Sequence, residues 1–175
     1  MEDDYDISSL KKKKKINSRT KGSSFERKIA KIFNNKFNTT EFSRTPGSGA
    51  FATTHSLPDH LKIYGDLITP QNFKYCIECK KGYNKENLYS LYNYSSDFWK
   101  FIGQCEKDSE KCNKIPMIIF KQDRHPTLVI IPDYVQTTEG YPYIKIKKID
   151  ALFPIVYRVY KFDDLLEDCI LTWFD

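Results

Sequence analysis

Long apolar runs are missing from this sequence. No run among its 175 residues approaches the roughly 20 apolar residues that are needed to cross a membrane. The first residues also lack the charged and then apolar pattern of a secretory signal peptide. We therefore expect a soluble, intracellular protein without a membrane partner, in the cytoplasm of a prokaryotic or virus-infected cell.

Cysteine is sparse, and its five copies are odd in number and scattered. This distribution argues against a disulfide framework and predicts reduced thiols. Cys76 and Cys79 form a Cys-x-x-Cys pair, but on a strand their side chains would face opposite sides. No second pair of ligands in register is evident, so a zinc or iron–sulfur site is disfavoured.

Internal repeats and domain linkers are also absent, whereas apolar residues are plentiful. Hydrophobic residues make up 40% of the chain and aromatic residues 15%, which is enough to build the core of a single domain. We place this domain at residues 23–175. The formal net charge of +5 is mild, but the basic residues are concentrated locally, which makes a polyanionic partner plausible.

Residues 1–22 form a segment with almost no apolar side chains, which begins acidic and becomes strongly basic. Such a composition predicts a disordered arm that neutralises phosphates without reading base sequence. A solvated tail with no partner explains the composition equally well. The candidate DNA-binding side chains of this arm are Lys11, Lys12, Lys13, Lys14 and Lys15.

The most informative stretch covers residues 64–81. Residues 67–69 suit a short strand, residues 70–72 a turn and residues 73–81 a second strand, so the sequence predicts a hairpin. On the second strand, alternation directs one set of side chains into the core and the other set away from it. The core set is Phe73, Tyr75, Ile77 and Cys79.

Glu78 and Lys80 would point together to the other face, and Asp66 would join them across the hairpin. Two carboxylates beside an ammonium group suit a magnesium ion, with Asp66 and Glu78 as hard oxygen ligands. Lys80 would then orient or deprotonate the attacking water and offset charge on the phosphorane. Because an isolated Glu-x-Lys is more often a weak ion pair on a solvated strand, upstream residues must decide between these interpretations.

Residues 23–37 carry apolar side chains at helical spacing, which predicts the first helix. Ser23 and Glu26 fit a capping box, in which Glu26 reaches back to the start of the helix. The spacing alone therefore favours a structural role for Glu26 over a catalytic one. The apolar stripe consists of Phe25, Ile29, Ile32, Phe33 and Phe37.

A short strand at residues 41–44 leads into a turn at residues 45–49, where Pro and Gly exclude regular structure. Arg44 and Ser48 could approach a phosphate there, although the same residues also fit an ordinary loop. Residues 50–62 form a long irregular loop, and loops of this length are often functional or mobile.

A second helix follows, which Ser96 or Asp97 would cap. It carries Gln104, which is either a plain surface amide or a helper of the site. The side chains that share its buried face are Phe98, Ile102, Cys105 and Ser109.

The remaining chain adds strands and one helix. Alternating apolar residues predict strands at residues 115–121, 127–132, 143–149 and 155–160. Asp163 would cap a final short helix that extends to residue 169, and the acidic residues of this helix suggest a solvated face.

Four ordered motifs resemble those of the archaeal-type Holliday-junction resolvases, which belong to the PD-(D/E)XK nuclease superfamily. They are residues 21–27 (KGSSFER), 42–49 (FSRTPGSG), 65–66 (GD) and 77–80 (IECK). The resemblance implies a single nuclease domain of the α/β class, with a restriction-endonuclease-like mixed β-sheet flanked by helices and extra C-terminal strands. Gly stands where the superfamily name has Pro, and the loop before it is longer than in compact cellular resolvases.

The resemblance also implies roles for individual residues. Asp66 and Glu78 become the metal ligands, and Lys80 becomes the catalytic lysine. Glu26 becomes an active-site acid that contacts the metal directly or through water, and Ser48 an active-site hydroxyl. The further DNA contacts are Arg27, Arg44 and Lys81.

The sequence thus predicts a magnesium-dependent DNA endonuclease, in which manganese could substitute, acting on four-way or other branched DNA. Resolution of a four-way junction needs two active sites and hence a two-fold homodimer. Such an enzyme would serve DNA recombination, repair or viral genome processing. The alternatives are a restriction-like or repair nuclease that cuts duplex or flap DNA, a protein that binds branched DNA without cutting it, and a structural protein with a chance motif match.

Overall fold

The computed structural model describes residues 17–46, 64–87, 90, 96–147, 155–168 and 170–175. Several sequence predictions therefore lie outside the described residues. These are the basic arm with Lys11 to Lys15, the active-site hydroxyl of Ser48, and the loop at residues 50–62.

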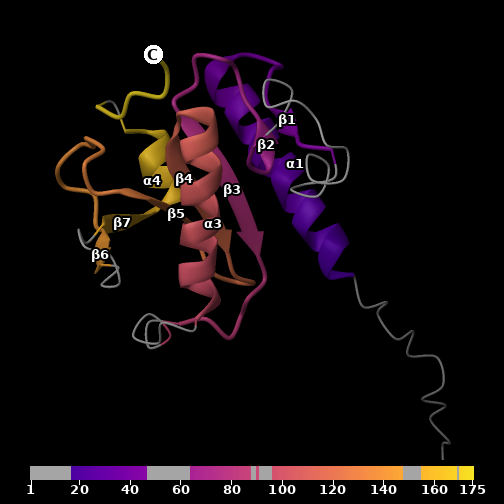
Figure 1. The fold of residues 1–175 in the computed structure, drawn as a ribbon, viewed down its shortest axis with the longest axis vertical. Helices are drawn as coiled ribbons and strands as arrows, with labels where there is room; N and C mark the ends of the chain where they lie inside the picture. The colour runs from indigo at the N-terminus through magenta and orange to yellow at the C-terminus, as the bar shows by residue number, and fades with distance from the viewer. Residues whose placement is uncertain (1–16, 47–63, 88–89, 91–95, 148–154, 169) are drawn as a thin grey trace, which may run out of the picture.

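A five-stranded mixed β-sheet forms the centre of the molecule, in the order β3-β4-β5-β7-β6 (Figure 1). Its first pair, β3 and β4, is parallel, and the other pairs are antiparallel. The strands are β3 (Tyr75–Lys81), β4 (Ile115–Lys121), β5 (Thr127–Pro132), β6 (Ile144–Lys147) and β7 (Val156–Lys161). The predicted strands at residues 115–121 and 127–132 are confirmed. The strand predicted at 155–160 is shifted by one residue. The strand predicted at 143–149 is found at Ile144–Lys147, and residues 148–149 lie outside the described residues.

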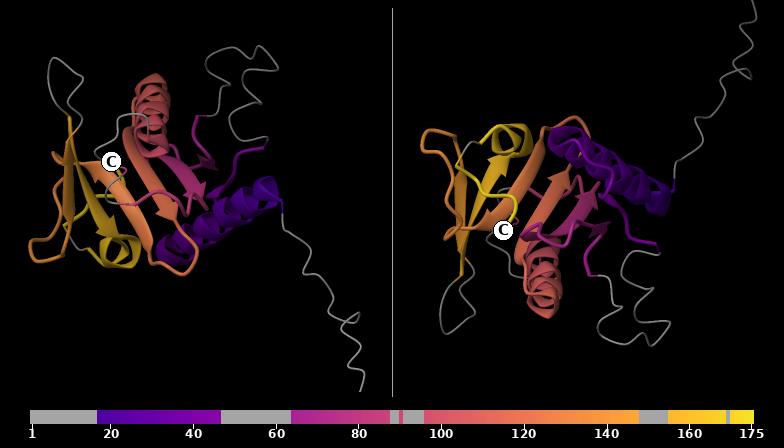
Figure 2. Two further views of the ribbon diagram at one scale, coloured as in Figure 1. Left: turned by 90° about the horizontal axis from the view of Figure 1, so that it is seen from below. Right: turned by 90° about the horizontal axis from the view of Figure 1, so that it is seen from above.

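Helices cover both faces of this sheet. Seen along its edge, α1 (Ser18–Phe37) and α4 (Phe162–Leu166) lie on one face and α3 (Asp97–Cys112) lies on the other (Figure 2). The parallel β3–β4 pair is connected through α3, as a parallel pair requires a crossover. The predicted α/β fold with helices flanking a mixed sheet and with extra C-terminal strands is therefore confirmed. None of the described helices is long and apolar enough to span a membrane.

The first helix begins earlier than the sequence predicted. Asn17 caps it, because its side chain accepts the backbone N–H of Arg19, and the helix ends at Asn38 in the left-handed conformation. The capping box at Ser23 and Glu26 was wrong, since both residues lie within the helix and the Ser23 hydroxyl donates to the carbonyl of Thr20. Residues 18–22, which were expected in the arm, are helical.

Phe33 anchors α1 to the rest of the core. It has no exposed surface, and its ring lies 5.2 to 5.7 Å from the rings of Phe42, Phe73, Phe162 and Trp173. Such aromatic pairs contribute about 0.5–1.5 kcal/mol each beyond the burial of their area. This cluster fixes α1 against the start of β3 and against the chain that leads into β1.

On the opposite face, Ser96 caps α3 by accepting the backbone N–H of Phe98 at 3.1 Å. The predicted buried face of this helix is confirmed, since Phe98, Ile102, Cys105 and Ser109 are all buried. Of these, Phe98, Ile102 and Cys105 pack against residues of β4 and β5, which are Ile118, Phe120 and Ile130. The helix thereby presents a fixed row of side chains beside β3.

The predicted hairpin between residues 67–69 and 73–81 was wrong in its pairing. β2 (Leu67–Ile68) pairs with β1 (Ser43–Arg44) in a separate two-stranded sheet. Its connection to β3 is a hydrogen bond from the backbone N–H of Asp66 to the carbonyl of Ile77 at 2.8 Å. The alternation predicted for β3 nevertheless holds, because Tyr75, Ile77 and Cys79 enter the core beneath α1.

The final helix also differs from the prediction. α4 begins at Phe162 after Lys161, which makes no side-chain cap, and Asp163 lies inside the first turn. Asp168 is buried instead of lying on a solvated face. Its carboxylate accepts the backbone N–H groups of Thr138 and Leu171, and so it closes the turn after the helix.

Candidate active site

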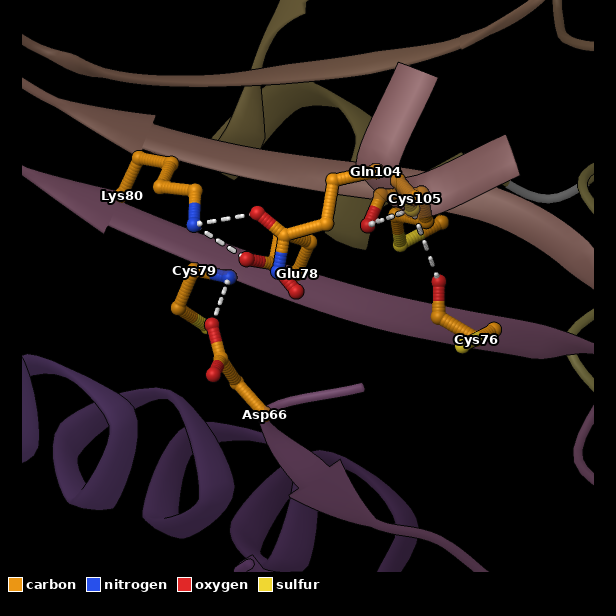
Figure 3. Close-up of polar contacts among 8 residues, drawn as sticks. Asp66, Cys76, Glu78, Cys79, Lys80, Gln104 and Cys105 are labelled. Atoms are coloured by element: carbon orange, nitrogen blue, oxygen red, sulfur yellow. Dashed lines mark hydrogen bonds and ion pairs between the residues drawn. The ribbon is translucent and has the colours of Figure 1, made fainter. Parts of the chain in front are cut away.

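The candidate site is built on the outer edge of the sheet, where β3 lies. Alternation along this strand places Ile77 and Cys79 under α1, whereas Glu78 and Lys80 extend toward α3 (Figure 3). Glu78 is buried, with 2% of its surface exposed, and Lys80 is partly buried. The pair that the sequence predicted to share one face therefore does so, in the space between β3 and α3.

Asp66 completes the site from the edge of β3. Its carboxylate accepts the backbone N–H of Cys79 at 2.8 Å, and its own N–H donates to the carbonyl of Ile77 at 2.8 Å. Asp66 thus occupies the place that a neighbouring strand would otherwise take. Its carbonyl accepts the N–H of Thr45 at 3.0 Å, which connects the site to the end of β1.

Gly65 makes this approach possible. Its φ is +76°, and a Cβ at this position would lie 2.7 Å from the carbonyl oxygen of Ile77. Any other residue would be strained and would push the chain away from β3. The residue that stands in the position of the superfamily's Pro is therefore required by the close contact between this segment and β3.

Lys80 is held by groups from two elements. Its ammonium group is hydrogen-bonded to the Glu78 carboxylate and donates to Oε1 of Gln104 at 3.3 Å (Figure 3). It also lies 5.3 Å from the centre of the Phe101 ring, an arrangement that favours a cation. Gln104 and Phe101 are three residues apart on α3 and so share one helix face. Gln104 is exposed and contacts Lys80, and its help to the site stays a prediction.

Burial makes the two carboxylates hard to ionise. It raises the pKa of Asp66 to about 6 and the pKa of Glu78 to about 7. The charge of Glu26 raises the pKa of Asp66 further, and the charge of Asp66 does the same for Glu78, whereas Lys80 lowers both. Three carboxylates thus lie close enough to repel one another, and a cation would offset that repulsion.

Lys80 itself stays charged in this environment. Burial opposes its charge, but the neighbouring Glu78 carboxylate outweighs that effect and raises the pKa of the Lys80 ammonium group. In the metal-free form Lys80 is therefore a hydrogen-bond donor and a positive charge.

Glu26 and Arg44 form an ion pair beside the carboxylates. Glu26 lies on the buried face of α1 with 6% of its surface exposed, and its Oε2 accepts the Nε–H of Arg44 from β1. Arg44 therefore holds an acidic residue here, in addition to the phosphate contact predicted for it. Arg27 is exposed on the adjoining surface of α1, and Lys81 lies half-buried at the end of β3.

The donor set is chemically suited to a hard divalent cation. Magnesium commonly uses one or two carboxylates and keeps several waters, and Asp66 and Glu78 could supply those carboxylates. Within the described ranges, no three His, Cys, Asp or Glu side chains form a group able to hold a metal ion. Glu26 is turned toward Arg44, and Glu78 toward Lys80.

The four cysteines that the structure describes form no second candidate centre. Cys76, Cys79, Cys105 and Cys112 are free thiols, and Cys79 packs into the core under α1. Cys76 instead lies beside Cys112 at the end of α3. The two sulfurs of the Cys-x-x-Cys thus face opposite sides of β3, as predicted.

Comparisons with known proteins identify relatives of this chain. The family model described as "Phage putative PDDEXK endonuclease" matches residues 17–168. The chain is also similar to Protein D14 of Escherichia phage T5, with 34% identity over 122 residues that cover 66% of this chain and 71% of that protein. No solved structure matches the chain significantly. The superfamily that the motifs indicated is confirmed, and the chain belongs to the phage PDDEXK endonuclease family of nucleases.

Proposed function

We propose that the chain is a divalent-metal-dependent, structure-selective DNA endonuclease that hydrolyses phosphodiester bonds in branched DNA. The observation that carries this proposal is the convergence of Asp66, Glu78 and Lys80 on β3, at the outer edge of the sheet. Magnesium is the expected metal, and manganese should substitute for it. The process served would be recombination, repair or viral genome processing.

In this proposal, Asp66 and Glu78 bind the metal, and Glu26 assists directly or through a bound water. When bound, the metal supplies Lewis acidity toward the phosphate and lowers the pKa of water. Because Lys80 is charged, its role is to orient the attacking water and to stabilise the negative charge that develops on the phosphate. Gln104 positions the Lys80 ammonium group from α3.

DNA would be held by basic groups around the site. Arg27 and Lys81 lie on the adjoining surfaces of α1 and β3. Arg44, which pairs with Glu26, would contact a phosphate on exchanging that partner. Ser48 would add a hydroxyl to the active-site loop. Lys11 to Lys15 would bind the DNA backbone irrespective of its shape. The affinity for DNA would therefore fall as the salt concentration is raised.

Four-way DNA is the proposed substrate because the ordered motifs resemble those of junction resolvases. Two cuts in opposing strands then require two sites, and a two-fold homodimer would supply them. The test is to incubate purified protein and magnesium with four-way, flap and linear DNA of matched sequence. Paired cuts in the four-way DNA support the proposal. Equal cutting of linear duplex points to a restriction-like or repair nuclease, and binding without cutting contradicts the proposed nuclease activity on these DNAs.

A further inference from the structure

Tyr83 is an exposed aromatic residue near Lys80 of the candidate site, since both contact Phe101. It follows the end of β3, three residues after Lys80, and 42% of its surface is exposed. Single exposed aromatic rings are common on protein surfaces, and what distinguishes Tyr83 is its place beside Lys80 and the way it is held.

The backbone of Tyr83 is held in an unfavourable conformation. Its φ is +50°, which costs free energy for a residue with a bulky side chain. The surroundings impose this conformation. The Tyr83 carbonyl accepts both the N–H of Glu86 and the side-chain amide of Gln122 at 3.0 Å. Asn84 forms two further hydrogen bonds with Asp123 of the β4–β5 turn.

The ring of Tyr83 is positioned as firmly as its backbone. It lies 4.6 Å from the ring of Phe101, at 66°, and Phe101 is itself buried on α3. The same Phe101 ring supports the Lys80 ammonium group. Tyr83 and Lys80 therefore contact the same buried ring, which sets the position of the tyrosine ring relative to the Lys80 ammonium group.

Positive charges gather at Asp123, which is hydrogen-bonded to Asn84, the residue after Tyr83. A hydrogen bond from Asn84, together with the charges of Lys21, Lys81 and Arg124, lowers the pKa of Asp123. Lys21 belongs to α1, Lys81 to β3, and Arg124 to the β4–β5 turn. Three elements thus place cations near the Asp123 carboxylate that Asn84 contacts, one residue from Tyr83. Such groups suit a nucleic-acid backbone that passes an aromatic side chain.

We propose that Tyr83 stacks on an unpaired base beside the scissile phosphate. The substrate then contains a nucleotide that has left the helical stack at the cut, as occurs at branch points, bulges and gaps. This inference rests on the proposed nuclease function and adds to it the feature of the DNA that the site selects. A base in a continuous duplex is stacked on both sides and cannot offer a face to Tyr83.

The variants that test this proposal separate the ring from the backbone. Tyr83→Asn removes the ring but tolerates the positive φ, because Asn adopts this region more readily than most residues. Tyr83→Phe keeps the ring. Tyr134→Asn is the matched control, since Tyr134 is also an exposed tyrosine. It follows the C-terminal end of β5, whereas the β4–β5 turn that contacts Asn84 precedes this strand.

The first measurement is cleavage, in magnesium buffer, of two DNAs that differ by one unpaired nucleotide at the cut. Base stacking on an aromatic ring contributes enough binding free energy that its loss should lower cleavage of the unpaired substrate about tenfold or more. Tyr83→Asn should show this loss while cutting the paired DNA at the wild-type rate. Tyr83→Phe and Tyr134→Asn should cut both DNAs normally. Equal losses on both DNAs, or no loss on either, would overturn the proposal.

The second measurement does not depend on cleavage. The unpaired nucleotide is replaced by 2-aminopurine, whose fluorescence falls when it stacks, and binding is followed in calcium buffer. Quenching by wild type and Tyr83→Phe but not by Tyr83→Asn supports the stacking role even if no DNA is cut. Cleavage by the wild type with identical quenching by all variants refutes the stacking role and leaves the nuclease function intact.

Discussion

The carboxylate of Asp66 accepts the backbone N–H of Cys79 at 2.8 Å, along the outer edge of β3. Together with the hydrogen bond from the Asp66 N–H to the Ile77 carbonyl, this contact sets where the acidic group lies relative to Glu78 and Lys80. The position of Asp66 is thus fixed by the main chain of the strand that carries the other two groups.

We expect Asp66→Asn and Glu78→Gln each to abolish cleavage while DNA binding persists or tightens. Each change removes a candidate metal ligand and also removes negative charge that repels phosphate. Cleavage of four-way DNA and binding by gel shift measure the two effects separately. Asp163→Asn, at an exposed carboxylate on α4, is the control and should behave as the wild type. A variant of either site residue that cuts at the wild-type rate would show that the site is wrongly assigned.

Glu26→Gln should separate catalysis from structure. Glutamine keeps an oxygen that can accept the Arg44 N–H, so the free energy of unfolding should fall by only about 1 kcal/mol. An acid that positions a metal or its water must carry charge, so cleavage should fall by about 100-fold or more. Thermal melting and cleavage are measured on the same preparation, with the exposed Glu41→Gln as control. Cleavage by Glu26→Gln at the wild-type rate would show that Glu26 serves only as the ion-pair partner of Arg44.

Gly65→Ala should destabilise the protein and impair the site together. The new methyl group would meet the Ile77 carbonyl at 2.7 Å in a strained backbone, at a cost of about 2 kcal/mol or more. Gly140→Ala is a matched control, because Gly140 also has a positive φ but no atom lies within 4 Å of the added Cβ. Urea unfolding gives the stabilities. Equal losses in the two variants would contradict the importance of the close contact with β3.

The stability of the metal-free protein should fall as pH rises. A carboxyl whose pKa is raised on folding contributes stability below its unfolded pKa, and this contribution is lost as pH rises through the folded pKa. The pKa rises on folding from 3.8 to about 6 for Asp66 and from 4.5 to about 7 for Glu78, so the melting temperature in EDTA should fall between about pH 4 and pH 7.

Magnesium should reverse this loss, because a bound cation favours the ionised carboxylates. At 100 times its dissociation constant, a ligand of the folded state adds about 2.7 kcal/mol. The increase in melting temperature on adding magnesium should therefore be larger at pH 8 than at pH 5. Asp66→Asn and Glu78→Gln should each flatten the pH profile in EDTA. An unchanged profile in both variants would assign the pH dependence to other groups.

Periodicity predicted most of the fold because the core faces of α1, α3, β4 and β5 are each encoded by a regular pattern of apolar residues within one segment. It failed where long-range contacts decide the structure. β2 pairs with β1, from which it is separated by more than twenty residues, and no local pattern encodes that choice. The start of α1 was missed because Ser23 and Glu26 fit a capping box, while Asn17 is the residue that caps the helix.

The candidate site shows the same division. Asp66, Glu78 and Lys80 could be found from the motif and from alternation on a strand. Phe101 and Tyr83 were missed, since an aromatic residue in an amphipathic helix normally indicates core, and a tyrosine after a glycine normally indicates a turn. The three-residue spacing between Phe101 and Gln104 was the available signal that both face Lys80.

The residues that pack against the start of β3 come late in the chain, which has a consequence for the timing of synthesis. The Tyr75 hydroxyl donates to the carbonyl of Thr172, 97 residues further along the chain, and Trp173 packs against the Phe73 ring. At roughly 5–20 residues per second, the ribosome adds this partner about 5–20 s after it has made β3. The strand that carries Glu78 and Lys80 therefore lacks its final support while the nascent chain is being extended, so a nuclease of this design would become fully competent only after most of its chain has left the ribosome.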